Sequence, residues 1–112
     1  METKDVGNIL KQIVEKLINK EFESIYKEDY NPNYSISELE FAINDYPEKI
    51  IQPCDPNLYL DFSFYNIDIN HWKIEFNFYT INNEKTDLTL KLLIRDNDGG
   101  AFSYSIKDIR TM

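Results

Sequence analysis

Residues 72–79 read WKIEFNFY, and this stretch decides the fold because apolar and polar side chains alternate along it. Successive side chains of a strand point to opposite faces of a sheet, so the four apolar residues from Trp72 to Phe78 share one face. We therefore expect a strand here, with Trp72 buried. Residues 88–94, LTLKLLI, alternate in the same way after a short connection at 82–86. Two such segments joined by a short link predict an antiparallel hairpin with one apolar face.

Two further segments extend the hairpin into a four-stranded antiparallel meander. Apolar residues alternate along 58–64 and along 102–106, and the connections at 66–71 and 96–100 are short. The alternation changes phase near Asn66, which indicates a bulge or a turn there. The opposite, open face of the predicted sheet carries tyrosine and acidic side chains, and these form a candidate contact surface: Tyr59, Asp61, Tyr65, Glu75 and Tyr79.

The first half of the chain is helical by its periodicity. Apolar residues from Val6 to Ile18 recur at the three- and four-residue spacing of an amphipathic helix, and a short second helix is expected to end near Glu28. An amphipathic stripe of this kind is stable only against a partner surface, which the apolar sheet face supplies.

A third helix is expected to begin near Ser37, where Glu40 stands three residues on and completes a capping box. Ser35 with Glu38 fits the same motif two residues earlier. The sequence therefore predicts two alternative starts for this helix, two residues apart. Pro47 ends this helix because the residue before a proline disfavours the helical conformation.

The expected fold is therefore one α+β domain over residues 1–112. It has two layers, with N-terminal helices at about 3–46 packed on one face of a four-stranded antiparallel meander sheet at 58–110, and a loop at 47–57. A chain of 112 residues is long enough for a single core of its own. By analogy, the curved sheets of cystatin-like and nuclear-transport-factor-like folds are the nearest architectures.

Composition excludes several classes of function. Cys54 is the single cysteine and His71 the single histidine, so neither an intrachain disulfide nor a histidine-based metal cluster can form. With only three glycines, the chain cannot form a glycine-rich phosphate-binding loop. We expect no cofactor and no metal. A formal charge of −8 repels nucleic acids and anionic lipids. The apolar runs are too short for a membrane span and the first residues do not resemble a signal peptide, so a cytoplasmic location is expected.

Residues that could carry chemistry have simpler structural explanations. Cys54 and His71 could form a nucleophile and base only if folding brought them together, and the adjacent Asp55 opposes thiolate formation. The stretch 96–99, DNDG, is similar to the start of a calcium loop, but Lys107 stands where the bidentate glutamate is required, so a hairpin turn is favoured. Carboxylates on the open sheet face are expected to pair with lysines of neighbouring strands. We therefore expect no catalytic residues.

Acidic residues concentrate in one quarter of the chain. Residues 21–48 hold eight carboxylates against the single Lys27, which accounts for nearly all of the excess negative charge. Such clustering favours a directed surface that attracts a basic protein partner. The candidate partner-binding residues are Glu21, Glu23, Glu28, Asp29, Glu38, Glu40, Asp45 and Glu48.

Three features resemble a widespread family of small uncharacterised bacterial domains. They are the amphipathic N-terminal helix, the capped Ser-Glu-Leu helix that ends at Asp45-Tyr46, and the strand start TDLTL at 86–90, where the family carries Ser in place of Thr86. The resemblance covers most of the chain and implies no activity. Small size and acidity also resemble the immunity proteins of contact-dependent growth inhibition and related polymorphic-toxin systems, which neutralise a cognate toxin, often a basic nuclease.

The expected function is accordingly that of a non-enzymatic binding protein, an immunity protein that occludes a basic, nuclease-like toxin. The alternative is a small enzyme or ligand-binding domain of the nuclear-transport-factor-like kind, with a pocket between helices and sheet. A filled core with an acidic surface favours the first, whereas a polar pocket under the helices favours the second.

Overall fold

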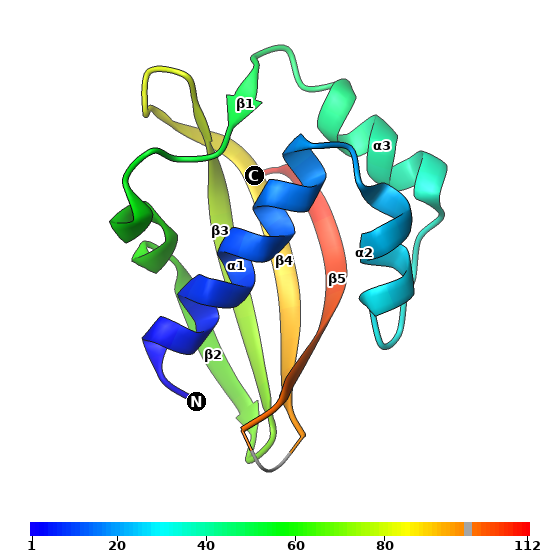
Figure 1. The fold of residues 1–112 in the computed structure, drawn as a ribbon, viewed down its shortest axis with the longest axis vertical. Helices are drawn as coiled ribbons and strands as arrows, with labels where there is room; N and C mark the ends of the chain where they lie inside the picture. The colour runs from blue at the N-terminus through cyan, green and yellow to red at the C-terminus, as the bar shows by residue number, and fades with distance from the viewer. Residues whose placement is uncertain (98–99) are drawn as a thin grey trace.

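The computed structural model describes residues 1–97 and 100–112, and in it three helices precede an antiparallel sheet (Figure 1). The expected α+β class, with N-terminal helices before the sheet, is confirmed. The elements are α1 (Thr3–Ile18), α2 (Phe22–Glu28), α3 (Ile36–Asn44), β1 (Ile50–Ile51), the 3-10 helix η1 (Pro56–Leu60), β2 (Ser63–Asp68), β3 (His71–Thr80), β4 (Lys85–Asp96) and β5 (Phe102–Thr111).

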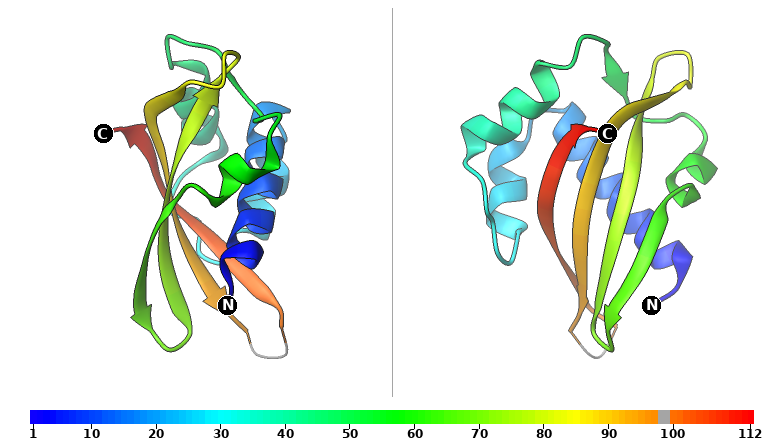
Figure 2. Two further views of the ribbon diagram at one scale, coloured as in Figure 1. Left: turned by 90° about the vertical axis from the view of Figure 1, so that its left-hand side faces the viewer. Right: turned by 180° about the vertical axis from the view of Figure 1, so that it is seen from behind.

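Strand β3 organises the sheet. One side of β3 pairs along its length with β4, which in turn pairs with β5, and all of these pairings are antiparallel. The other side of β3 pairs with β2 over residues 71–75 and with the short β1 at residues 79–80. Strands β5 and β2 therefore form the two long edges of the sheet, as Figure 2 shows from behind.

The core lies between α1 and one face of the sheet. Helix α1 crosses that face diagonally, and the helices lie on one side of the sheet and leave its other side uncovered (Figures 1 and 2). The stripe of α1 is buried as expected, and it meets the inward side chains of β3 and β4, which are almost completely buried: Leu10, Ile13, Val14, Leu17, Ile74, Phe76, Leu90, Leu92 and Ile94.

The expected strand at residues 58–62 is wrong, because residues 58–60 belong to η1 and residues 61–62 form a link to β2. Asp55 caps η1 by accepting a hydrogen bond from Asn57 N at 2.9 Å, and Pro56 occupies its first turn. Tyr59 then turns inward and stacks on Phe76, with the ring centroids 5.8 Å apart. Gly7 of α1 lies against η1, where a Cβ would come within 2.9 Å of Leu60 Cδ2.

Two irregularities in the pairing of β3 shape the sheet. The phase change expected near Asn66 is confirmed as a register shift between Asn66 and Asp68. A second shift, between Asn77 and Tyr79, was not expected from the sequence. It breaks the alternation so that Phe78, Tyr79 and Thr80 are all buried.

The start of α3 follows the Ser35 register, and the Ser37 register is wrong. Ser35 Oγ accepts a hydrogen bond from Glu38 N, and the Glu38 carboxylate accepts one from Ser35 N, each at 3.1 Å. The loop expected at 47–57 also contains β1 and the first turn of η1. Trp72 packs against the core but is half-buried, because it lies near the end of the sheet beyond most of α1.

Candidate functional site

The acidic residues of the expected binding surface lie on α2, on α3 and beside them. These two helices stand next to each other near the β5 edge of the molecule (Figure 1). Seven of the eight predicted carboxylates are exposed: Glu21, Glu23, Glu28, Glu38, Glu40, Asp45 and Glu48. The sequence therefore placed most of the excess charge correctly on the surface.

Asp29 is the exception, because its carboxylate is buried with 5% of the residue exposed. Its Oδ2 accepts hydrogen bonds from Ile106 N at 2.8 Å and from the Tyr34 hydroxyl at 2.7 Å, and its Oδ1 accepts one from Asn31 N at 2.9 Å. Burial, followed by this bond to Asp29, raises the pKa of Tyr34 well above its usual value. Asp29 thus fastens the α2–α3 linker to β5, and the expectation that it lies on a partner-binding surface is wrong.

Two of the exposed carboxylates also have structural partners. Glu28 forms an ion pair with Lys16 of α1 and accepts a hydrogen bond from the Tyr104 hydroxyl at 3.0 Å. Glu38 caps α3. In the part of the chain that the structure describes, no hydrogen bond or ion pair engages the carboxylates of the other five: Glu21, Glu23, Glu40, Asp45 and Glu48. These five are the carboxylates available to a partner.

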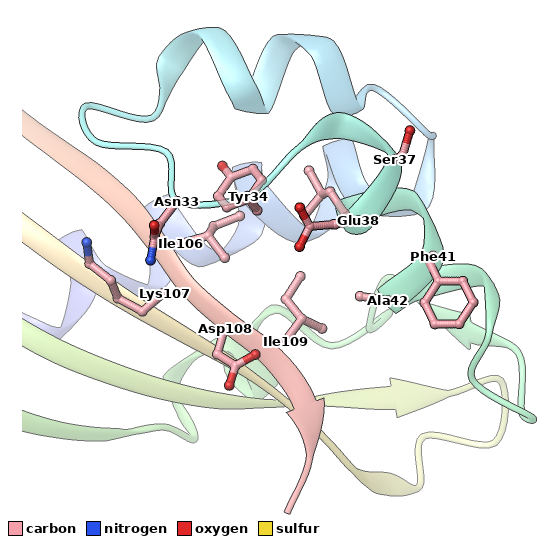
Figure 3. A pocket seen from close by; sticks show the side chains of 11 residues that line it. Asn33, Tyr34, Ser37, Glu38, Phe41, Ala42, Ile106, Lys107, Asp108 and Ile109 are labelled. Atoms are coloured by element: carbon pink, nitrogen blue, oxygen red, sulfur yellow. The ribbon is translucent and has the colours of Figure 1, made fainter.

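A groove opens between β5 and α3, the helix that carries part of the acidic segment (Figure 3). Its volume is about 550 Å³. Its apolar lining comes from the two facing elements: Leu39, Phe41 and Ala42 from α3, and Ile106 and Ile109 from β5. Polar groups at its margin include Glu38, Lys107 and Asp108.

Phe41 is the unusual residue of this groove. The residue is 66% exposed although the neighbouring Leu39 and Ile43 of the same helix are buried. This exposure was not predicted from the sequence. The available signal was the helical period, because Leu39, Ala42 and Ile43 lie on one face of α3 and Phe41 falls outside it.

The second candidate surface does not exist as a row of exposed tyrosines. Tyr59 and Tyr79 are each 3% exposed and belong to the core, Tyr59 because η1 replaces a strand and Tyr79 because of the bulge in β3. Tyr65 is 54% exposed. The expected cross-strand pairing of carboxylates with lysines is confirmed for Glu75, which lies 3.8 Å from Lys91. Asp61 lies outside the strands and pairs with Lys85 at 3.1 Å, a lysine that was not among the expected partners.

The described residues contain no group of three side chains that could hold a metal ion. His71 Nδ1 lies 2.9 Å from Asp68 Oδ1, and this hydrogen bond is the largest cause of the lowered pKa of Asp68. Cys54 is an exposed, free thiol in the loop before η1. In the stretch 96–99, Asp98 and Gly99 lie outside the described residues. The next residue, Gly100, has a positive φ of 84°, a conformation that glycine adopts readily in hairpin turns.

Comparison with known proteins places the chain in a family. A family profile described as "Domain of unknown function (DUF7668)" matches residues 14–112. The chain belongs to this family. No curated protein and no solved structure matches the chain. The match begins in the last third of α1 and continues through α2, α3 and the complete sheet, which agrees with the resemblance to a family of small uncharacterised domains.

In the described part of the chain, no helix is long and apolar enough to cross a membrane.

Proposed function

We propose that this chain is a non-enzymatic binding protein that takes a basic protein partner at the α3–β5 groove and the acidic surface beside it. The observation that carries the proposal is Phe41, a large apolar side chain that is exposed at the margin of an apolar groove. Aromatic residues of this kind dominate the energetics of protein interfaces when a partner covers them. Covering the exposed part of Phe41 would contribute about 1–2 kcal/mol by burial alone.

The charge beside the groove supports a basic partner. Glu40 and Asp45 lie on α3 and at its end, and both carboxylates are available. Attraction between opposite charges raises the rate of encounter, and its effect decreases as salt screens it. We propose further that the partner is a toxin, such as a basic nuclease, and that the chain acts in the bacterial cytoplasm as its immunity protein by occluding the toxin's substrate groove.

The packing of the core supports this proposal over a nuclear-transport-factor-like enzyme or ligand carrier. Such a protein needs a pocket between its helices and its sheet. In the described structure, that space is occupied by side chains that are almost completely buried, among them Leu10, Phe76 and Leu92. The groove that does exist opens outward at the sheet edge, where it is accessible to another protein.

The test is co-expression with the protein that the neighbouring gene encodes. We expect that protein to arrest growth, wild-type chain to relieve the arrest, and Phe41→Lys to relieve it poorly. Ile81→Lys is the matched control, because Ile81 is also 66% exposed but lies in the turn between β3 and β4. A neighbouring protein without toxicity, or arrest that the wild-type chain does not relieve, would contradict the proposal.

The acidic surface is tested by association rates with the same partner. Glu40→Lys with Asp45→Lys should slow association about tenfold at low salt, with a smaller difference above roughly 0.15 M. Glu15→Lys with Glu84→Lys changes the net charge equally at exposed positions on α1 and in the β3–β4 turn. Equal slowing by both pairs would indicate a general charge effect with no defined surface.

A further inference from the structure

Exposed apolar side chains concentrate at one edge of the sheet, away from the α3–β5 groove. Of the nine large apolar residues that are exposed in the described structure, five lie between residues 60 and 69. Their exposed fractions range from 48% for Leu60 to 85% for Ile69. We call this set the β2 edge patch: Leu60, Phe64, Tyr65, Ile67 and Ile69.

Strand β2 leaves its outer backbone edge without a strand partner. It pairs only with β3 among the described residues, and every residue of β2 is exposed. The row of N–H and C=O groups on such an edge is a template for another strand. Proteins usually protect these edges with lysine, proline, a bulge or a covering segment. In β2 the register shift lies at the end of the strand, between Asn66 and Asp68, whereas residues 62–67 contain no charged residue and no proline.

The opposite edge of the same sheet shows what protection looks like in this molecule. The α2–α3 linker covers β5, where Tyr30 N donates a hydrogen bond to Tyr104 O at 3.2 Å and the Asp29 carboxylate accepts one from Ile106 N. Arg95 then stacks over the Tyr30 ring, 4.2 Å from its centroid. The β5 edge is thus covered by the α2–α3 linker, whereas the β2 edge presents apolar side chains to solvent.

We propose that a second copy of this chain occupies the β2 edge, with the two β2 strands pairing antiparallel about a two-fold axis. The distribution of charge selects this occupant. Two copies that each carry a net charge of −8 repel one another over most of their surfaces. The stretch at 62–67 holds no charged residue and is flanked by Asp61 and Asp68, so it is the part of this edge along which two copies meet the fewest opposing carboxylates.

The two-fold arrangement also keeps the acidic helices apart. Helices α2 and α3 lie near β5, at the far side of the sheet from β2 (Figures 1 and 2). Pairing through β2 would join two sheets into one continuous sheet, with the acidic surface of each copy at an outer end. An antiparallel pair about a two-fold axis is self-complementary and closes at two copies.

The area of the patch is close to what a specific dimer needs. A fully exposed large side chain presents on the order of 200 Å², so five side chains that are 48–85% exposed present roughly 500 Å² in each copy. Two copies would cover up to about 1,000 Å² of side-chain surface, to which the paired backbone adds. Specific interfaces begin near 1,200 Å² in total, so we expect a dimer that dissociates in the micromolar range.

The test is the mass in solution, measured by sedimentation equilibrium. We expect wild-type protein at roughly 100 μM to have twice the chain mass of 13.3 kDa. Ile67→Lys should weaken dimerisation at least about 100-fold, because each dimer would then bury two lysines at the strand edge. Ile81→Lys is the matched control and should remain dimeric, since Ile81 is exposed in the β3–β4 turn.

Folding of the variants is checked independently of mass. Ile67 is 57% exposed, so its replacement should leave the far-UV circular dichroism unchanged, and Tyr65→Lys provides a second variant at the same edge. A monomeric wild type overturns the proposal. So does a dimer that Ile67→Lys and Tyr65→Lys leave intact, a dimer that Ile81→Lys dissociates equally, or an open polymer.

Discussion

Replacing Asp29 by alanine should strongly destabilise the protein, although Asp29 belongs to the acidic segment that the sequence assigns to the surface. The carboxylate accepts three hydrogen bonds, from Ile106 N, the Tyr34 hydroxyl and Asn31 N. Ile106 is 2% exposed, so its N–H cannot turn to solvent when the acceptor is removed. The substitution therefore leaves a buried donor unpaired and detaches the α2–α3 linker from β5.

The expected cost follows from these partners. A buried N–H without an acceptor costs about 1–3 kcal/mol, and hydrogen bonds to a charged group contribute about 1.5–3 kcal/mol each. The full sum overstates the loss, because water can reach Asn31 N, which belongs to an exposed residue. We expect Asp29→Ala to lower the free energy of unfolding by about 3–4 kcal/mol, a large part of the 5–15 kcal/mol typical of a domain. Asp29→Asn keeps one acceptor oxygen and should cost about half as much.

The assay is urea unfolding followed by far-UV circular dichroism and by the fluorescence of Trp72, the single tryptophan. The midpoint should decrease with an unchanged slope. Asp45→Ala is the matched control, because Asp45 is an exposed carboxylate near the end of α3, and it should change stability by less than about 0.5 kcal/mol. If Asp29→Ala is as stable as Asp45→Ala, the hydrogen bonds of Asp29 do not hold the linker and the reasoning is refuted.

Two further predictions concern hydroxyl groups that form hydrogen bonds within the fold. The Thr86 hydroxyl donates to Phe78 O at 2.9 Å and accepts from Leu88 N at 3.1 Å, so Thr86→Val should cost about 1–2 kcal/mol in urea unfolding whereas Thr86→Ser should cost clearly less; equal losses would contradict this. Burial raises the pKa of Tyr34 and of Tyr104 well above 10, so their contribution to stability is complete below the unfolded pKa of about 10 and is lost as pH rises above it. In an alkaline titration, absorbance at 295 nm should show these tyrosines ionising only as circular dichroism reports unfolding, and ionisation of all tyrosines near pH 10 in a folded protein would contradict the assignment.

The sequence predicted the sheet well where alternation and burial act together. Along β3 and β4 the inward residues from Ile74 to Phe76 and from Leu90 to Ile94 are completely buried, so the period of two reports the packing directly. The same period failed at 58–62, because Leu58 and Leu60 also fit one turn of a 3-10 helix. Pro56 after a capping Asp55 was the local signal for that helix.

The candidate site was predictable only in part, because burial of a charged residue depends on contacts far away in the sequence. Glu40 and Asp29 are both acidic residues of the helical half, yet Asp29 is fixed by Ile106, which lies 77 residues later. Tyr79 was misplaced for a similar reason, since a bulge in β3 moves it from the open face into the core. The groove itself requires the placement of α3 beside β5, which no local pattern encodes.

Residues of the stretches that carry the family resemblance fix α3 in its position beside the sheet. The residues that would contact a partner are different ones. The Tyr46 hydroxyl at the end of α3 donates to Asp87 Oδ1 at 2.7 Å, which ties the helix to the start of β4. Thr86 secures the bulge of β3 next to this contact. Phe41 and Glu40 take no part in these bonds and lie toward solvent. Substitutions at Phe41 would therefore alter the groove, and substitutions at Glu40 the charge of α3, while the frame stays intact. This division of roles suits the proposed binding function, in which the partner is defined by the surface.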